Sequence, residues 1–551
     1  MLFSRRFLPY FVTQCLGALN DNVYKNVLLL MVSYSQIDAL PIDVHLFVNL
    51  AAGLFILPFL LFSAHAGQIA DSIDKATLIR RLKVLELLIM SAAVLAIFSH
   101  SYLTMLLLLF LMGGQSAYFG PVKYSLLPRV LSEHELVSGN AWVEMGTFLA
   151  ILAGTLSAGL IVASEHVTYW AAGSVVTLAL MGVFSSWMIP SIPSSNKVKP
   201  KFSIIKATVT SISKVRKSRD IWIAILAISW FWFVGASYLT QIPNFARITL
   251  HSDPTVVSLL LLLFSIGIGI GSFVCERLSC KQVELGIAPL GLIVLGVFGI
   301  DLYAALPILA APTAVFDVVT FVSDAIHYRL MFDLLMIGVG GGLFIVPLYT
   351  FIQARADENE CAQAIASNNI VNALFMVTSA VFAMLVLNGL QWKIEQLFLL
   401  LAFGNLLVLL ILLLSWSELA MSAFSYVLRR MLNWQSINNT EELAALKQDK
   451  TAAIIIEVER FDLSTLFVIN GLFNRPVYIA TPQPDTQQNC LERYFINKRQ
   501  WDGAMQPLPV LVCTQGAILP ASIDNARWVK CSIKHGKKSW LRGGIEVKLT
   551  I

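Results

Sequence analysis

The chain has 551 residues, of which 57% are hydrophobic and only 13% are charged, and its formal net charge is +5. This composition excludes a soluble globular protein. It predicts an all-α polytopic membrane protein, because open sheets cannot span lipid and the apolar runs are far longer than barrel strands. The seven cysteines form no CxxC motif, so we expect no zinc site, and the sequence indicates no other metal or cofactor.

Twelve apolar segments are long enough to cross a bilayer, whose hydrocarbon core takes roughly 20 helical residues. We expect them near residues 7–33, 44–66, 79–98, 101–121, 139–162, 168–190, 220–245, 255–275, 283–305, 329–353, 365–388 and 396–416. A basic link divides them into six plus six. The predicted domains are an N-terminal six-helix bundle (1–190), a cytoplasmic linker (191–219), a C-terminal six-helix bundle (220–419) and a small cytoplasmic α/β domain (420–551).

The first segment carries polar side chains in its middle. Asp21 and Lys25 recur at helical spacing with Gln14 and Gly17, and Asn20 lies beside them. A carboxylate at the centre of a spanning helix costs roughly 2.5–3.5 kcal/mol unless it is paired or faces water. We therefore favour a face that looks into a protein interior or an aqueous cavity. The alternative is that Asp21 and Lys25 neutralise each other as an i, i+4 pair and only pack helices.

The distribution of Lys and Arg predicts the orientation of the chain. Placing the N-terminus in the cytoplasm leaves only Arg247, Arg329 and Lys393 in the loops outside. By the positive-inside rule, both termini are then cytoplasmic. The cytoplasmic set comprises the central link together with Lys75, Arg80, Arg81, Lys83, Lys123, Arg129, Arg277, Lys281 and Arg355.

A polar motif lies between the second and third segments. Gly67 and Asp71 are followed by the basic residues Arg80 and Arg81. We expect the glycine to permit a tight turn, and Asp71 to cap a helix or meet a basic residue across the interface of two bundles, which would latch one conformation. The matching stretch after Gly271 lacks the aspartate, so this latch is expected to be one-sided. The alternative is an ordinary polar turn.

The two halves of the chain repeat each other. Such a parallel repeat is typical of a secondary transporter with two bundles and a site between them at mid-membrane. The matching residues are Gly114, Pro121 and Arg129 with Gly340, Pro347 and Arg355, and Asn140 and Glu144 with Asn368 and Asn372.

Buried amides and carboxylates in these segments need partners. We expect Glu144, Asn140, Gln241, Asn368 and Asn372 to line a substrate path together with the residues of the first segment. The alternative is that they bond across helices and only hold them together. Asn140 and Asn368, near the cytoplasmic ends, fit that structural role best.

Several motifs resemble known families. The stretch of residues 67–81 resembles the cytoplasmic loop motif of the major facilitator superfamily. Residues 15–22, 120–128 and 138–144 resemble the bacterial lysophospholipid transporter family, and residues 229–233 and 366–376 resemble its subgroup fused to an acyltransferase and an acyl-carrier-protein synthetase. The resemblance implies movement of lysophospholipid to the inner leaflet of the bacterial inner membrane. It places the family's first-helix aspartate at Asp21, whereas a basic residue of the seventh helix has no match in 235–241.

The tail from about residue 420 contains short β-like runs at 452–458, 477–480 and 510–513. In the fused relatives an acyltransferase begins here and uses a His-x-x-x-x-Asp pair, but none of the eight histidines of this chain is followed by an aspartate at that spacing. We interpret the tail as a degenerate acyltransferase-like domain without catalysis. A docking surface for a separate acyltransferase or acyl-carrier-protein synthetase is one role that it could have kept.

These observations predict a secondary transporter or flippase for lysophospholipid such as lysophosphatidylethanolamine, with no nucleic-acid partner. No GxxxxGK[ST] motif occurs, so transport is not expected to be driven directly by ATP. Two alternatives stay open: a transporter of another amphiphile or drug with the same fold, and a lipid-remodelling enzyme that acts through the C-terminal domain.

Overall fold

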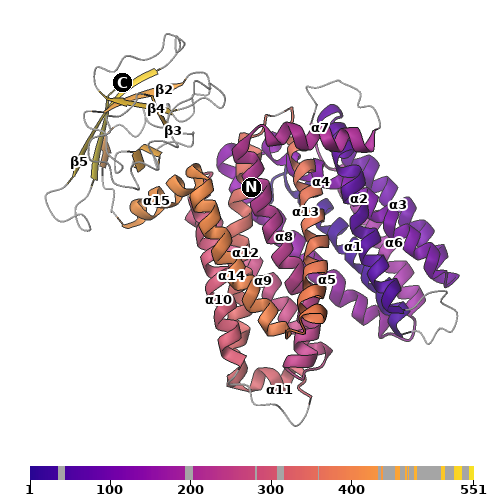
Figure 1. Cartoon of the computed structure of the whole chain (residues 1–551). Coiled ribbons are helices and arrows are strands. Elements are labelled where there is room, and N and C mark those ends of the chain that lie inside the picture. Colours follow the sequence, from indigo (N-terminus) through magenta and orange to yellow (C-terminus); the bar gives the residue numbers. More distant parts are fainter. Residues whose placement is uncertain are drawn as a thin grey trace. The chain divides into compact units, whose positions relative to one another are not determined.

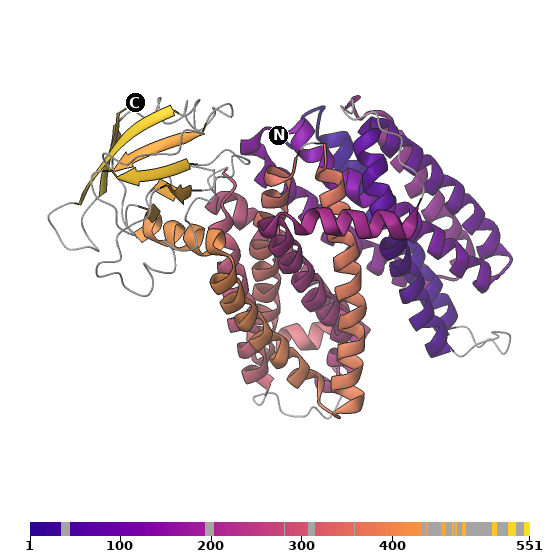
Figure 2. The ribbon, with the colours of Figure 1, turned by 45° about the horizontal axis from the view of Figure 1, so that its top comes forward.

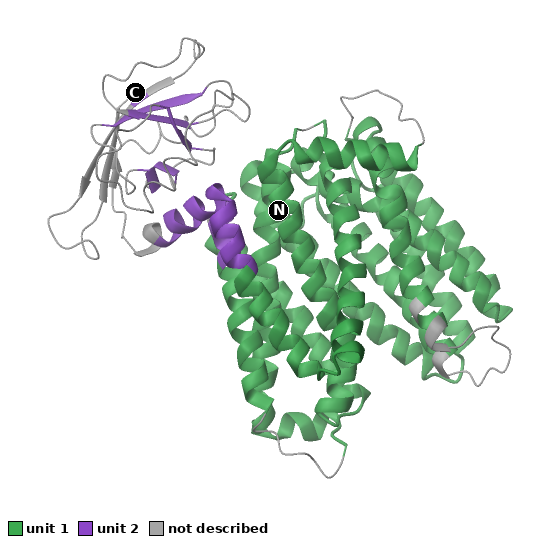
Figure 3. Cartoon of the chain, viewed as in Figure 1, with its two compact units in different colours: residues 1–283, 290–407 green, residues 284–289, 408–551 purple. Residues whose placement is uncertain are grey.

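A computed structural model describes residues 1–34, 44–192, 203–279, 282–306, 315–357, 359–431, 436–438, 453–458, 466–467, 469–470, 477–480, 510–514, 527–535 and 545–550. The chain forms two compact units (Figure 3). Unit 1 comprises residues 1–283 and 290–407, and unit 2 comprises residues 284–289 and 408–551.

The first half of unit 1 is a helical bundle around an apolar core (Figure 1). Its core residues come from α1 to α6, for example Tyr24, Met90 and Met112, which are fully buried. Because these helices are apolar on most faces, burial against one another and against lipid stabilises them. The helices are α1 (Leu8–Tyr34), α2 (Val44–Ser72), α3 (Lys75–Phe98), α4 (Tyr102–Val130), α5 (Glu133–Val162) and α6 (Val167–Trp187).

The second half of unit 1 is also helical. Its long helices are α8 (Arg219–Asn244), α9 (Pro254–Leu278), α10 (Ala288–Ala305), α12 (Tyr328–Arg355), α13 (Cys361–Met384) and α14 (Ile394–Ser415). Shorter elements are η1 (Phe245–Thr249), α11 (Val318–Ser323), η4 (Ala325–His327) and η5 (Leu385–Gly389). The main helix pairs that join the two halves in the described part are α2 with α13, α5 with α9, α4 with α13, α5 with α12 and α4 with α12.

Each predicted apolar segment overlaps one of these long helices. Ten helices of the described part are long and apolar enough to cross a membrane, so the chain is a multi-pass membrane protein. Helices α1 and α3 are not among the ten. Both carry polar or charged residues that are buried inside the bundle, such as Asn20 and Glu86. The count of twelve spans therefore stays a prediction.

Glycines set the packing of α9 on α12. A Cβ atom added at Gly267, Gly271, Gly338 or Gly342 would collide with backbone atoms of the facing helix. Only glycine lets the two backbones approach so closely, which is the packing role that small residues have in spanning helices.

The predicted linker contains a helix that the sequence analysis did not foresee. This helix, α7 (Ile204–Arg216), contacts α2, α8 and α13. Figure 2 shows it lying crosswise to the long helices of unit 1.

Unit 2 contains a sheet of order β1-β6-β5-β2-β4-β3, in which all pairs are parallel except β5 with β6. Three of its strands coincide with the predicted β-like runs. Helix α15 (Ser417–Met431) packs on η2 (Leu285–Ile287), where Gly286 meets the backbone of Ser422. The strands are β1 (Ser436–Asn438), β2 (Ile454–Val458), β3 (Val477–Ile479), β4 (Val510–Thr514), β5 (Arg527–His535) and β6 (Ile545–Thr550).

Candidate substrate path and gate

Asp21 and Lys25 of α1 bond to different partners. The Asp21 Oδ2 atom accepts a hydrogen bond of 2.6 Å from Ser116 Oγ of α4, and Oδ1 is buried with no hydrogen-bond partner in the described part of the chain. Lys25 Nζ donates to Asn22 Oδ1 at 3.1 Å and lies 5.6 Å from the centre of the Phe55 ring. Among the described contacts, neither side chain hydrogen-bonds to the other, and a role of the two residues in a substrate path stays a prediction.

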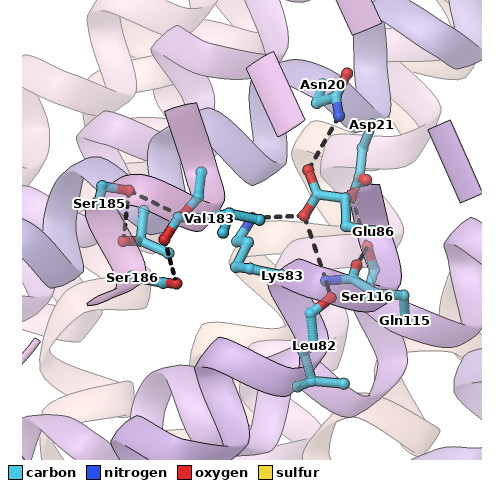
Figure 4. A network of polar contacts seen from close by, with 12 residues as sticks. Asn20, Asp21, Leu82, Lys83, Glu86, Gln115, Ser116, Val183, Ser185 and Ser186 are labelled. Carbon is cyan, nitrogen blue, oxygen red and sulfur yellow. Dashed lines mark hydrogen bonds and ion pairs between the residues drawn. The ribbon is translucent and has the colours of Figure 1, made fainter. Parts of the chain in front are cut away.

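An ion pair lies behind Asp21 in the interior of the first bundle (Figure 4). Lys83 Nζ and Glu86 Oε2 of α3 are 2.6 Å apart, and each side chain is only 1% exposed. Asn20 Nδ2 donates to Glu86 Oε1 at 3.0 Å, and Gln115 Nε2 lies 3.4 Å from Oε2. A buried charge needs such complete pairing, because an uncompensated one is very costly. Glu86 is thereby linked through Gln115 and Ser116 to Asp21.

The placement of Lys83 in a cytoplasmic loop was wrong. Its Nζ lies close to Gly17 of α1, and its stem lies against Gly182 of α6, so two glycines make the space for it. The Lys-x-x-Glu spacing of Lys83 and Glu86 inside an apolar run is the sequence signal for this pair, since residues three apart face each other on a helix.

Lys123 was also counted among the loop charges and is instead buried in α4. Its Nζ donates to Thr147 Oγ1 of α5 at 2.8 Å. One turn from Thr147, Glu144 is completely buried, with Oε1 accepting from the Tyr124 hydroxyl at 2.6 Å and Oε2 without a hydrogen-bond partner among the described residues. The Tyr124 ring stacks on Tyr349 of α12, with centroids 4.4 Å apart. Glu144 therefore lies directly behind an aromatic contact between the two halves.

Asp71 links the two halves at the end of α2. Its carboxylate accepts hydrogen bonds from the backbone N–H groups of Ala362 at 3.1 Å and Gln363 at 3.2 Å, and from Gln363 Nε2 at 3.3 Å. These groups belong to the first turn of α13, where unpaired N–H groups and the helix dipole favour an anion. Asp71 therefore caps a helix as expected, and that helix is α13 of the other half.

Gly67 lies inside α2 rather than at a turn, so the expected turn role was wrong. A Cβ atom here would come within 2.6 Å of Ala366 Cβ and 2.9 Å of the Ala362 carbonyl oxygen of α13. Gly67 therefore serves the close crossing of α2 and α13, one turn before Asp71.

The second half supplies a counterpart to the Asp71 contact. Ser138 Oγ of α5 donates to Glu276 Oε1 of α9, so the residue after the position of the missing aspartate provides a carboxylate. The expectation of a one-sided latch was therefore wrong. Close by, Asn140 and Gln353 exchange two hydrogen bonds of 2.6 and 3.0 Å between α5 and α12. All these contacts lie where α2, α9 and α12 end and α5 and α13 begin, so the two halves are closed together at this end.

Arg80, the third gating candidate, donates to the Ile189 carbonyl at 2.6 Å, a contact inside the first bundle. Asp74, in the loop before α3, accepts from Thr77 N at 2.7 Å, Ile192 N at 2.6 Å and Ser191 Oγ at 3.0 Å. Partial burial opposes its charge, but these hydrogen bonds outweigh that effect and hold the pKa of Asp74 below its usual value.

The remaining predicted path residues bond between or along helices. Asn368 Nδ2 donates to the Tyr349 hydroxyl at 3.3 Å, and the Asn372 amide lies 2.8 Å from Ser229 Oγ of α8. Gln241 pairs with Asn244 one turn further along α8, at 3.3 Å. Asn368 and Asn372 thus face the α12 and α8 side of the second bundle, whereas Asp21 and Glu144 belong to the first.

A cavity of about 410 Å³ lies between α5 and α9, which come from different halves. Its lining is apolar except at one end, where Arg277 contributes. The lining residues are Met145, Leu149, Ile266, Gly269, Ile270, Phe273, Val274 and Arg277.

Comparison with known proteins gives three findings. A family model described as Major Facilitator Superfamily matches residues 11–380. The lysophospholipid transporter LplT of Enterobacter sp. (strain 638) is 25% identical over 405 residues, which cover 71% of this chain and 91% of that protein. The protein of the same name from Escherichia coli O157:H7 is 25% identical over 70% of this chain and 90% of its own length.

Solved structures agree at the level of the fold. The E. coli fucose:proton symporter FucP superposes with a TM-score of 0.55 at 11% identity, covering 74% of this chain and 98% of that one. The human organic anion transporter MFSD10 gives a TM-score of 0.56 at 11% identity, covering 74% and 99%.

Proposed function

We propose that this chain, which belongs to the Major Facilitator Superfamily by the match over residues 11–380, moves lysophospholipid across a bacterial inner membrane by alternating access of two six-helix bundles. The observation that carries the proposal is the likeness to lysophospholipid transporters along about nine-tenths of their length. In this proposal α1 and α3 complete twelve spans, and their buried polar residues face protein rather than lipid.

The orientation follows the positive-inside rule, with both termini in the cytoplasm. The closed end at Asp71, Glu276 and Gln353 is then the cytoplasmic end. Gly67 and Asp71 act as gating residues through their contacts with α13, and Arg80 supports the same loop from within the first bundle.

A lysophospholipid combines one acyl chain with a headgroup that carries a phosphate. The apolar cavity between α5 and α9 suits the chain, and Arg277 lies at its end. For the headgroup we propose Asp21 as the partner of an amine and Lys25 as the partner of the phosphate, because each is hydrogen-bonded to a neutral side chain and not to the other. Lys25 would thus replace the basic residue that is missing from the seventh span.

In the first bundle, we propose that one other predicted path residue positions α1 and that two support the closed end. Asn20 positions α1 through Glu86, and Glu144 lies behind the Tyr124–Tyr349 stack, which has to part when the cytoplasmic end opens. Asn140 keeps this end closed through Gln353.

On the second bundle we propose that Gln241, Asn368 and Asn372 complete the path. Residues 420–551 are proposed as a degenerate acyltransferase-like α/β domain on the cytoplasmic side. It would not catalyse acyl transfer and would dock a separate acyltransferase or synthetase.

Reconstituted vesicles test the proposal. We expect the purified full-length protein to move labelled lysophosphatidylethanolamine between leaflets faster than protein-free vesicles, and Asp21→Ala to reduce this rate at least tenfold. Asp317→Ala, which removes an exposed carboxylate that caps α11, is the matched control and should leave the rate unchanged.

Equal rates in the wild-type protein and Asp21→Ala would remove Asp21 from the path. A wild-type rate no higher than that of empty vesicles would overturn the lipid assignment, and rapid movement of an unrelated amphiphile in the same vesicles would then favour the alternative substrate class. Acyl transfer to lysophospholipid by the full-length protein would contradict the catalytically inactive tail.

A further inference from the structure

Helix α7 has three different faces. Ala207, Ser211 and Val215, at successive fourth positions, are buried against the spanning helices. Ile205 and Val209, also four apart, are 79% and 62% exposed. Two large apolar side chains on an otherwise polar exposed surface are unusual for a helix that faces only water.

All charged residues of α7, and the residue that follows it, are basic. The stretch 204–217 contains four Lys or Arg residues and no Asp or Glu. On helical periodicity, Lys206 and Lys217 fall on the face next to that of Ile205 and Val209. An apolar stripe bordered by cations is the pattern of a helix that lies in the membrane surface, with apolar groups among the acyl chains and cations at lipid phosphates.

Contacts inside unit 1 fix α7 over the line where its two halves meet. Ala207 clusters with Ala64 of α2 and Ile370 of α13, which come from different halves. Lys214 Nζ lies 2.6 Å from Glu360 Oε1, directly before the first turn of α13 that Asp71 caps. Figure 2 shows α7 crosswise to the long helices, so its axis runs along a membrane surface rather than through the membrane.

We propose that the exposed face of α7 is a docking surface for anionic phospholipid of the leaflet on its side of the membrane. Ile205 and Val209 enter the apolar edge of the leaflet, and Lys206 and Lys217 contact lipid phosphates. The charge of this face selects lipid over the alternative of an apolar protein partner, because anionic leaflets attract each nearby cation and neutral partners do not. The surface depends only on the chain spanning a membrane, and it is independent of the substrate that the protein carries.

Spin labels on the full-length protein test this. Labels at Ile205, Val209 and Thr210 are compared in vesicles of phosphatidylcholine alone and in vesicles that also contain phosphatidylglycerol. Thr210 is the matched control, because it is exposed on the same helix and lies about 100° or more around its axis from Ile205 and Val209. We expect the ratio of oxygen accessibility to nickel-complex accessibility to be several-fold higher at the two apolar positions than at Thr210, and to rise further with phosphatidylglycerol.

The double substitution Lys206→Gln/Lys217→Gln should abolish the additional rise with phosphatidylglycerol while the melting temperature of the protein is unchanged. Labels at Ile205 and Val209 that are as water-accessible as the label at Thr210 in both vesicle types would overturn the proposal and leave a protein partner as the occupant. An accessibility ratio of these labels that is the same in both vesicle types would show that the basic face does not bind anionic lipid.

Discussion

Asp71→Asn tests whether the contact between α2 and α13 holds the closed end of the two bundles. The substitution keeps one oxygen acceptor for the N–H groups of Ala362 and Gln363 but removes the negative charge. Hydrogen bonds to a charged group contribute about 1.5–3 kcal/mol, and a charge at a helix N-terminus contributes about 0.3–2 kcal/mol. Because a neutral acceptor stays, we expect a loss of about 1–2 kcal/mol, which changes the ratio of closed to open molecules by about 5- to 30-fold.

Double electron–electron resonance measures this ratio. Spin labels at Arg81 and Ala354, both exposed at the same end of the molecule, report the separation of the two bundles. We expect Asp71→Asn to add a population at longer distance. The matched control is Asp74→Asn, three residues later, because among the contacts described above Asp74 bonds only to Thr77 and to Ser191 and Ile192 directly after the first bundle, and to no residue of the second half. A distance distribution for Asp71→Asn that matches the wild-type one would refute the reasoning, as would an equal change in the control.

Three other outcomes follow from the same contacts. Gly67→Ala places a Cβ atom against Ala366, so we expect about 1–3 kcal/mol of destabilisation confined to the closed state, seen as a longer distance in the same resonance experiment and contradicted by an unchanged one. Lys83→Met leaves Glu86 buried without its cation and should lower the stability of the protein by about 3–5 kcal/mol, seen as a lower melting temperature in detergent. The double variant Lys83→Met/Glu86→Leu should melt near the wild-type temperature. Equal melting temperatures of the single and double variants would contradict the ion-pair argument. The pKa of Asp74 is lowered in the folded protein. Its stabilising effect is therefore present above the pKa that Asp74 has in the unfolded chain, and it is lost as pH falls through the pKa of Asp74 in the folded protein. Asp74→Ala should reduce the melting temperature at neutral pH and leave it unchanged in strong acid.

Most of the long helices could be predicted from the sequence because each is a nearly continuous apolar run of spanning length, and α1 and α3, which carry buried polar residues, are the exceptions. Asp71 could be predicted because a carboxylate before basic residues marks a helix end. The charges of α3 and α4 could not. Lys83 and Lys123 were assigned to loops, because the sequence does not show that Gly17 and Gly182 make room for one lysine or that Thr147 accepts from the other.

Helix α7 escaped prediction for a related reason. Its apolar residues are spaced on two faces among lysines, so no run of spanning length appears, and the basic composition is typical of a loop. The counterpart of Asp71 escaped as well, because Glu276 is shifted by one residue from the repeat position. A helix rotates by about 100° per residue, so a match by sequence offset misses a carboxylate that the fold still brings to the interface.

The glycine contacts between α9 and α12 have a mechanical consequence. At these four glycines no side chain separates the two backbones, so the helices cannot slide along each other without a backbone clash. We therefore expect α9 and α12 to move together as one rigid body. Glu276 and Gln353, which contact α5, both lie near the same end of this helix pair. A tilt of the pair that moves one of them away from the first bundle also moves the other, so we expect both contacts with α5 to break together.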